Sequence, residues 1–328
     1  MNARTNRWLD AVLRWSPAQP AFWWRNAHRL AVLAYHGIDD PEHFEGHLDY
    51  IWRNAHAVEA AEAIAAIEGR RDLPPRPVLI TFDDGQRSVL ELGLPMLRER
   101  GLPAVAFVVA GLVDTDEPFW WDEVRDLHER GGSVSTMPSL GADELFKALK
   151  RLPDELRREA TEELRRTASS QAARTPQLTS ADVAAMESGG IEIGNHTWSH
   201  PSLSRCSDAV VEREMRDSHV KLTRILGHAP ATFAHPYGDR DVRADRFLEE
   251  LGYAAAFLFD HRMSPPRPSD RFAVSRLQVN SSTTNDRFQT IVSGLHPALH
   301  RIRRKLSVMT SVPRPRTSSS RSSTTGRP

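Results

Sequence analysis

The sequence has a single cysteine, no long apolar run and no excess of charge of either sign. Cys206 has no partner in the chain, which excludes an internal disulfide and a metal site built from several thiolates. Lys and Arg together number 43, as do Asp and Glu, so the formal net charge is zero. A neutral chain has no global field that attracts nucleic acid or an anionic membrane. We therefore expect no nucleic acid among its partners.

No stretch of the sequence is apolar over a length that would span a bilayer. Residues 1–24 carry arginines and tryptophans, but neither the continuous apolar core nor the small-residue cleavage site of a secretory signal. We therefore expect a cytoplasmic protein without a transmembrane segment. Residues 1–29 form an amphipathic segment that either packs on the protein's own body or makes peripheral contact with a membrane.

Short apolar runs alternate with helical patterns through much of the chain. The segment 44–66 has helical spacing, and a second helical pattern closes before Gly101. Alternation of this kind predicts an α/β fold with a parallel sheet and right-handed crossovers. The predicted strands are Leu30–Tyr35, Val78–Phe82, Ala104–Val109, Ile191–Asn195, Thr232–Ala234, Ala254–Phe259 and Phe272–Val279.

The alternation stops between residues 112 and 176, where charged helical sequence, notably 143–168, predicts a helical insertion over one end of the sheet. A partner-binding arm is the alternative interpretation of this region. We divide the chain into the N-terminal segment 1–29, a catalytic domain 30–280 and a C-terminal extension 281–328. Beyond about residue 312 the extension lacks apolar residues that could pack, so disorder is expected there.

Two adjacent carboxylates follow the predicted strand Val78–Phe82. Asp83 and Asp84 stand at its carboxyl end, where α/β folds place their chemistry, and Gly85 lets the chain turn away. Successive residues of a strand point to opposite sides, so the two carboxylates are suited to different tasks. A plain Asp-Gly turn that caps the next helix is the alternative.

Two histidines follow another predicted strand. His196 and His200 are four residues apart, a spacing that brings two imidazoles close enough to share a metal ion. Alone, such a pair is more typical of a surface or capping arrangement. Together with the Asp83–Asp84 pair it indicates a site of two histidines and one carboxylate with open positions for water and substrate. These donors suit Zn²⁺, while Co²⁺, Ni²⁺ and Fe²⁺ remain alternatives.

Thr81-Phe-Asp-Asp-Gly85 and His196-Thr-Trp-Ser-His200 together resemble the first two motifs of the polysaccharide deacetylase family, carbohydrate esterase family 4. The resemblance covers about residues 30–279. It implies that Asp84, His196 and His200 bind the metal and that Asp83 is the general base acting on a metal-activated water. It also implies a distorted (β/α) barrel with fewer than eight strands.

Phe233-Ala-His-Pro-Tyr-Gly238 resembles the third family motif, in which the backbone amide at the position of Tyr237 helps to hold the oxyanion. A plain turn after a strand is the alternative. The family usually has an arginine that orients the catalytic aspartate, and Ala234 stands at that position. The sequence leaves open whether His235 or Arg276 takes over this role.

The late Leu-x-His motif that supplies the general acid is also missing, because Arg276-Leu-Gln-Val-Asn280 contains no histidine. Both departures are similar to one branch, the biofilm poly-N-acetylglucosamine deacetylases, in which a Tyr-His pair at the end of the first strand supplies the acid. Tyr35-His36 matches this feature, which makes His36 the candidate acid. A capping or buried structural histidine is the alternative.

The resemblance implies a metal-dependent hydrolase that removes N-acetyl groups from a polysaccharide, an oligosaccharide or a lipid-linked sugar. The same metal machinery would serve an O-acetyl esterase or an amidase of small amides. A non-catalytic glycan-binding protein is the alternative from another class, although a pseudoenzyme has little reason to keep a general base beside three ligands.

Overall fold

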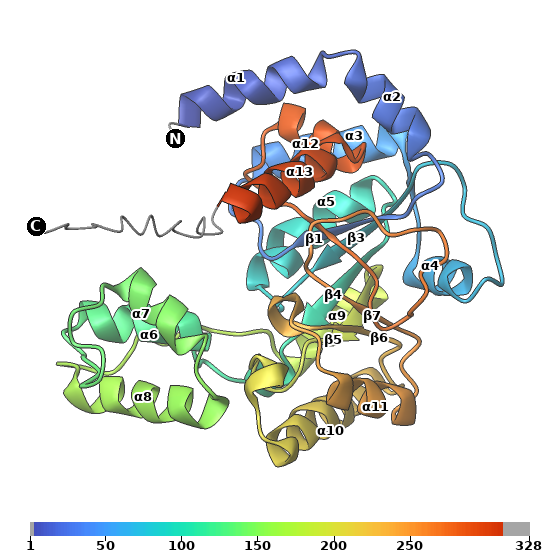
Figure 1. Ribbon diagram of the computed structural model, residues 1–328. Coiled ribbons are helices and arrows are strands. Elements are labelled where there is room, and N and C mark those ends of the chain that lie inside the picture. The colour runs from blue at the N-terminus through green and yellow to red at the C-terminus, as the bar shows by residue number, and fades with distance from the viewer. Residues whose placement is uncertain (1–2, 311–328) are drawn as a thin grey trace, which may run out of the picture.

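The computed structural model describes residues 3–310 and is built around one parallel sheet (Figure 1). The strand order is β7-β6-β5-β4-β3-β1-β8, and β2 pairs with the start of β3. The strands are β1 (Ala31–Tyr35), β2 (His56–Ala57), β3 (Pro77–Phe82), β4 (Ala104–Val108), β5 (Ile191–Asn195), β6 (Thr232–Ala234), β7 (Ala255–Phe257) and β8 (Leu277–Gln278).

Helices follow most of the strands, as crossovers between parallel strands require. They are α1 (Ala3–Arg14), α2 (Ala18–Arg25), α3 (Pro41–Asn54), α4 (Ala60–Ile67), α5 (Leu94–Glu99), α6 (Trp120–Glu129), α7 (Ala142–Leu149), α8 (Asp154–Thr167), α9 (Ser180–Ser188), α10 (Asp208–Leu226), α11 (Val242–Glu250), α12 (Asn285–Val292) and α13 (Leu295–Thr310). Among the described residues, no helix combines the length and the apolar character needed to cross a bilayer.

One segment nearly closes the sheet into a barrel. Residues 271–274 exchange backbone hydrogen bonds with β7, and Phe257 and Val274 form a parallel bridge. The chain then shifts across to pair β8 with β1. The predicted last strand, Phe272–Val279, is therefore divided between two neighbours. The prediction of a distorted (β/α) barrel with fewer than eight strands is confirmed, with seven strands in the continuous path.

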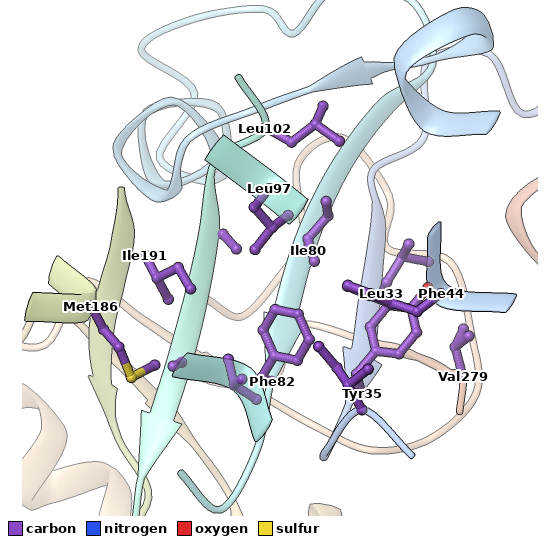
Figure 2. Close-up of a cluster of buried hydrophobic side chains, with 14 of the residues drawn as sticks. Leu33, Tyr35, Phe44, Ile80, Phe82, Leu97, Leu102, Met186, Ile191 and Val279 are labelled. Atoms are coloured by element: carbon purple, nitrogen blue, oxygen red, sulfur yellow. The ribbon is translucent and has the colours of Figure 1, made fainter. Parts of the chain in front are cut away.

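Alternate strand residues pack on the two faces of the sheet. Leu33, Ile80 and Phe82 point outward toward α3, α5 and α9, where they join the cluster of Figure 2. Tyr35 lies in this layer with its ring centroid 5.6 Å from that of Phe82. The intervening residues, such as Phe107, fill the inside of the barrel. Because both faces are covered, the strands consist almost entirely of apolar residues, as parallel sheets require.

Two stretches that were each predicted as one helical segment contain two helices. The prediction of a single helix over residues 44–66 is wrong, because α3 ends at Asn54 and the chain becomes extended at Ala55. Strand β2 then pairs with β3 before α4 begins. The charged stretch 143–168 is likewise two helices, α7 and α8, with Pro153 at the cap of the second. A proline sits readily at a helix start but not within one.

Helices α6, α7 and α8 form a lobe that stands out from the sheet in Figure 1 (green). They enclose an apolar cluster of their own, which includes Val124, Leu127, Leu145 and Leu164. This lobe occupies the region in which we predicted an insertion.

The first and last helices among the described residues pack together, away from the lobe (Figure 1). The Gln19 side chain donates to the Gln289 carbonyl (3.0 Å), and Asn26 donates to the Ser293 carbonyl (2.9 Å). These bonds join α2 to α12 and to the turn before α13 (Figure 1). The predicted disorder beyond about residue 312 lies outside the described residues.

Candidate active site

The predicted site residues stand at the carboxyl ends of neighbouring strands. Asp83 continues the pairing of β3 with β1, because its backbone N–H donates to the Tyr35 carbonyl (2.9 Å). Asp84 then leaves the strand with a left-handed φ of 71°. His196 directly follows β5, and its backbone N–H donates to the carbonyl of Val108 at the end of β4. The strands thus deliver these polar side chains to one edge of the sheet.

Asp84, His196 and His200 form a buried cluster of ligand atoms that all lie within 4.8 Å of one another. The Asp84 Oδ1 atom lies 3.6 Å from His196 Nε2 and 3.4 Å from His200 Nε2. The two Nε2 atoms are 3.1 Å apart. This is the set of one carboxylate and two imidazoles that the sequence predicted.

The protonation of the cluster fits a divalent cation. His196 Nδ1 lies 2.8 Å from the Ala234 carbonyl, which can only accept, so its proton is on Nδ1 and its Nε2 lone pair faces the cluster. Burial lowers the pKa of His196 to about 4 and that of His200 well below its ordinary value, so both are neutral at pH 7. Burial and the charge of Asp83 raise the pKa of Asp84.

Asp84 Oδ1 is buried without a hydrogen-bond partner among the described residues. Leaving a buried carboxylate oxygen unpaired is costly. A cation bound at this oxygen and the two imidazoles would supply the missing partner and the missing charge, which is why we interpret the cluster as a metal site.

Asp83 is held by Arg276, a fully buried arginine that immediately precedes β8. The guanidinium donates to both carboxylate oxygens, at 2.6 and 2.8 Å, and its Nε donates to the Leu258 carbonyl (2.7 Å). Burial alone would raise the pKa of Asp83, but the charge and hydrogen bonds of Arg276, together with His196 and His36, hold that pKa below its ordinary value. Asp83 is therefore ionised and fixed in orientation.

Of the two candidates for the role of the missing arginine, Arg276 contacts Asp83 and His235 does not. His235 points away, with its Nε2 3.0 Å from the Phe272 carbonyl. Arg276 makes the paired contact, and Ala234 instead contributes its carbonyl to His196. His47 is also a structural histidine, because it lies between the Tyr35 hydroxyl (3.1 Å) and the Thr283 carbonyl.

His36 lies at the end of β1, with its ring edge-on to Phe259 at 5.4 Å between centroids. It is close enough to Asp83 for their charges to interact, as each shifts the pKa of the other. Burial lowers the pKa of His36, and the charge of Asp83 opposes that shift. The site therefore has a further imidazole near the Asp83 carboxylate.

Tyr237 lies in a single 3₁₀ turn after β6 and has a left-handed φ of 59°. Its ring packs edge-on against His200, with centroids 4.5 Å apart. The lobe reaches the site here, because Trp120 Nε1 donates to the Tyr237 hydroxyl (3.0 Å) and Trp121 contacts the His200 ring. The lobe is thus connected to His200 by aromatic contacts.

A buried glutamate that sequence reasoning missed holds the histidine loop. Glu214 of α10 accepts from the backbone N–H groups of Trp198 (2.9 Å) and Ser199 (2.8 Å), and from the Ser199 hydroxyl (2.7 Å). Burial raises the pKa of Glu214, an effect that the Ser199 donors oppose. A signal for it exists, since Glu214 shares the helical face of Val211 and Ser218 that the fold buries.

Several residues of the site have strained backbones. Asp84, Thr197, His200 and Tyr237 all have φ between 58° and 71°, a region that side-chain-bearing residues rarely adopt. Each such residue costs about 1–2 kcal/mol. Strain of this kind gathers at functional sites, where surrounding contacts enforce it.

A cavity of about 320 Å³ opens beside His200, between the histidine loop and the lobe. The indoles of Trp120, Trp121 and Trp198 line it together with arginines of α8. Flat aromatic faces of this kind can stack on sugar rings. Of the Asp84–His196–His200 cluster, the cavity is lined by His200.

Comparison with known proteins indicates the same family as the sequence motifs. Residues 70–139 and 148–256 match the family described as polysaccharide deacetylase. A chitin deacetylase of Pestalotiopsis sp is 37% identical over 71 residues, which is 22% of this chain and 24% of that protein. The chain thus spans about a quarter of the length of that curated relative.

Two solved structures share the fold over most of their length. IcaB from Ammonifex degensii has a TM-score of 0.57 and 21% identity, covering 82% of this chain and 97% of that one. The Streptococcus pyogenes deacetylase PplD, in complex with acetate, has a TM-score of 0.57 and 16% identity, covering 80% and 98%. At these identities, the likeness is one of fold.

Proposed function

Because the chain belongs to the polysaccharide deacetylase family, a family of hydrolases, we propose that it removes N-acetyl groups from a carbohydrate in a metal-dependent reaction. The products are a free amine and acetate. The observation that carries this proposal is the ionised Asp83, fixed by Arg276 beside the Asp84–His196–His200 cluster. The substrate is a polysaccharide, an oligosaccharide or a lipid-linked sugar.

A divalent cation at Asp84, His196 and His200 supplies Lewis acidity toward the acetyl carbonyl. Zn²⁺ suits two neutral imidazoles and a carboxylate, and Co²⁺, Ni²⁺ and Fe²⁺ are alternatives. A cation held there would also offset the charge of the buried Asp84, whose pKa is raised by burial and by the charge of Asp83.

The protein's own groups move the protons. Asp83 takes a proton from the attacking water, because its lowered pKa keeps it deprotonated and Arg276 fixes its orientation. The backbone N–H of Tyr237 donates to the oxygen of the tetrahedral intermediate. The proton on Asp83 then passes to the neighbouring His36, and the resulting imidazolium gives it to the departing amine as the carbon–nitrogen bond breaks. Both residues thereby regain their starting protonation states as acetate and amine leave.

Replacing Asp83 with Asn tests this assignment. Since the amide cannot accept the proton, we expect deacetylation of acetylated chito-oligosaccharides to fall by about 10²- to 10⁴-fold. Metal content, measured by elemental analysis, should stay unchanged because the substitution leaves the three ligands in place. Asp84→Asn, His196→Gln and His200→Gln should instead lose the metal.

The matched control is Asp72→Asn, which changes an exposed aspartate on a surface ion pair with Arg267 and should keep full activity. Near-normal turnover by the Asp83 variant would contradict the proposed base. Release of acetate from O-acetyl esters but from no N-acetyl sugar would identify an esterase instead.

A further inference from the structure

Helices α1 and α2 and the turn between them carry four exposed apolar side chains. Trp8 and Val12 of α1 and Trp15, the residue after it, are spaced i, i+4 and i+7, so they follow one helical face, and their exposures are 66%, 45% and 78%. Trp24 of α2 is 82% exposed. We refer to these four residues as the aromatic stripe. Exposing three tryptophans on adjacent short helices is unusual for a surface that meets only water.

The stripe is held on the body of the protein rather than on a free arm. On the other side of α1, Asp10 is buried and pairs with Arg287 of α12 at 3.2 Å. The Arg14 side chain bonds Gln289, and Gln19 bonds the Gln289 carbonyl and the Ser293 hydroxyl. Figure 1 shows α1 and α2 as the outer layer over α12 and α13. The stripe therefore faces away from the fold.

Charge is distributed unevenly in the same region, although the whole chain is neutral. The sequence has no Asp or Glu between Asp10 and Asp39, and none after Asp286. Both stretches contain arginines, including the exposed Arg25 of α2 and the exposed Arg301 of α13. The zero net charge thus conceals a local positive excess around α2 and α13, which contact each other.

Exposed indoles beside basic groups, in α1 and α2 whose one acidic residue among those described, Asp10, is buried and paired with Arg287, are suited to the interface of an anionic membrane. Indole rings settle at the headgroup level, and each arginine near an anionic surface adds attraction. We propose that the aromatic stripe and the adjoining basic residues dock this protein on a bilayer that contains anionic phospholipid. A protein partner is the less favoured occupant, because the local charge selects an anionic surface.

Vesicle sedimentation with the full chain tests the docking surface. Wild type should bind vesicles of phosphatidylcholine with phosphatidylglycerol more strongly than vesicles of phosphatidylcholine alone, and added salt should weaken the binding. The variant Trp8→Ser/Trp15→Ser/Trp24→Ser lacks the apolar area that would insert into the bilayer. Its affinity for the mixed vesicles should therefore be at least about tenfold lower than that of wild type. Its hydrolysis of a soluble acetylated sugar should equal that of wild type.

Two further variants distinguish binding through this surface from non-specific adsorption to vesicles. Trp52→Ser removes an equally exposed tryptophan (61%) on α3, outside the stripe, and should bind like wild type. Arg25→Glu/Arg301→Glu should reduce binding only to the mixed vesicles, by about fivefold for each arginine lost. The proposal is overturned if the triple variant binds like wild type, if lipid charge has no effect, or if wild type binds neither kind of vesicle.

Discussion

Asp83 and Asp84 are neighbours in the chain, yet their surroundings give them opposite properties. Arg276 lowers the pKa of Asp83, whereas burial and the charge of Asp83 raise the pKa of Asp84. One carboxylate is therefore stable as an anion without a metal, and the other needs a cation. This difference supports the proposed division between a base and a ligand.

Replacing Arg276 with Gln should disable the base without touching a metal ligand. Asp83 would lose its counter-charge, so its pKa should rise and the acidic limb of the pH–rate profile should move to higher pH. We expect turnover at neutral pH to fall about a hundredfold. Breaking a buried ion pair should also lower the free energy of unfolding by about 3–5 kcal/mol. Steady-state kinetics across pH and urea unfolding measure both effects.

Arg271→Gln is the control for that variant, because it breaks the partly exposed pair with Glu249 and should change stability by less than about 1 kcal/mol. Arg276→Lys should retain part of the activity, since a lysine keeps the charge but not the paired contact. An unmoved acidic limb in Arg276→Gln would show that Arg276 does not set the pKa of Asp83.

At the residue scale, the sequence predicted the cluster of Asp84, His196 and His200, but it did not single out Arg276 as the residue that holds Asp83. Asp84, His196 and His200 carry recognisable spacings beside strand ends. Arg276 is distant in sequence from Asp83 and has no spacing that marks it, so it stayed one of two candidates. Only the closure of the barrel brings the segment before β8 over the end of β3.

At the scale of elements, α10 positions the histidine loop through Glu214. Glu214→Gln would replace one acceptor oxygen with an N–H₂ group that cannot accept from Ser199. We expect the loop to loosen and the affinity for Zn²⁺ to fall by about 10- to 100-fold, as for other residues that orient metal ligands. Competition with a chromogenic chelator measures this.

Glu212→Gln, on the exposed side of the same helix, should leave the affinity for Zn²⁺ unchanged. Equal affinities for Glu214→Gln and wild type would rule out a positioning role for Glu214. The exposed control matters here, because both changes remove one negative charge from α10.

The two helices that the sequence predicted as continuous are interrupted for different reasons. Helical spacing of apolar residues continues across the break at Ala55, where tertiary pairing of β2 with β3 overrides it. The break before α8 has a local signal in Pro153, which a prediction from the spacing of apolar residues does not use. The spacing therefore predicted helical regions, whereas strand pairing in one case and a proline in the other set where the helices end or begin.

At the scale of the whole molecule, buried neutral histidines make stability depend on pH. Burial lowers the pKa of His47 to about 4, from an ordinary 6.5. Between these values the unfolded chain binds a proton that the folded chain does not, so stability is full above pH 6.5 and falls as the pH drops toward 4. His47 alone should account for up to about 3 kcal/mol of that loss.

Chemical unfolding at several pH values checks this sign. His47→Gln should flatten the dependence between pH 6.5 and 4, whereas the exposed His56→Gln should leave it unchanged. A His47 variant with the slope of wild type would mean that His47 is not held neutral in the fold.

The Arg276–Asp83 pair also has a consequence for the order in which the protein matures. A chain made from its N-terminus contains Asp84, His196 and His200 well before Arg276 is added. The ligands can thus gather on the ribosome while Asp83 still lacks its arginine. Competence for proton transfer is then acquired last, when the segment before β8 closes the barrel.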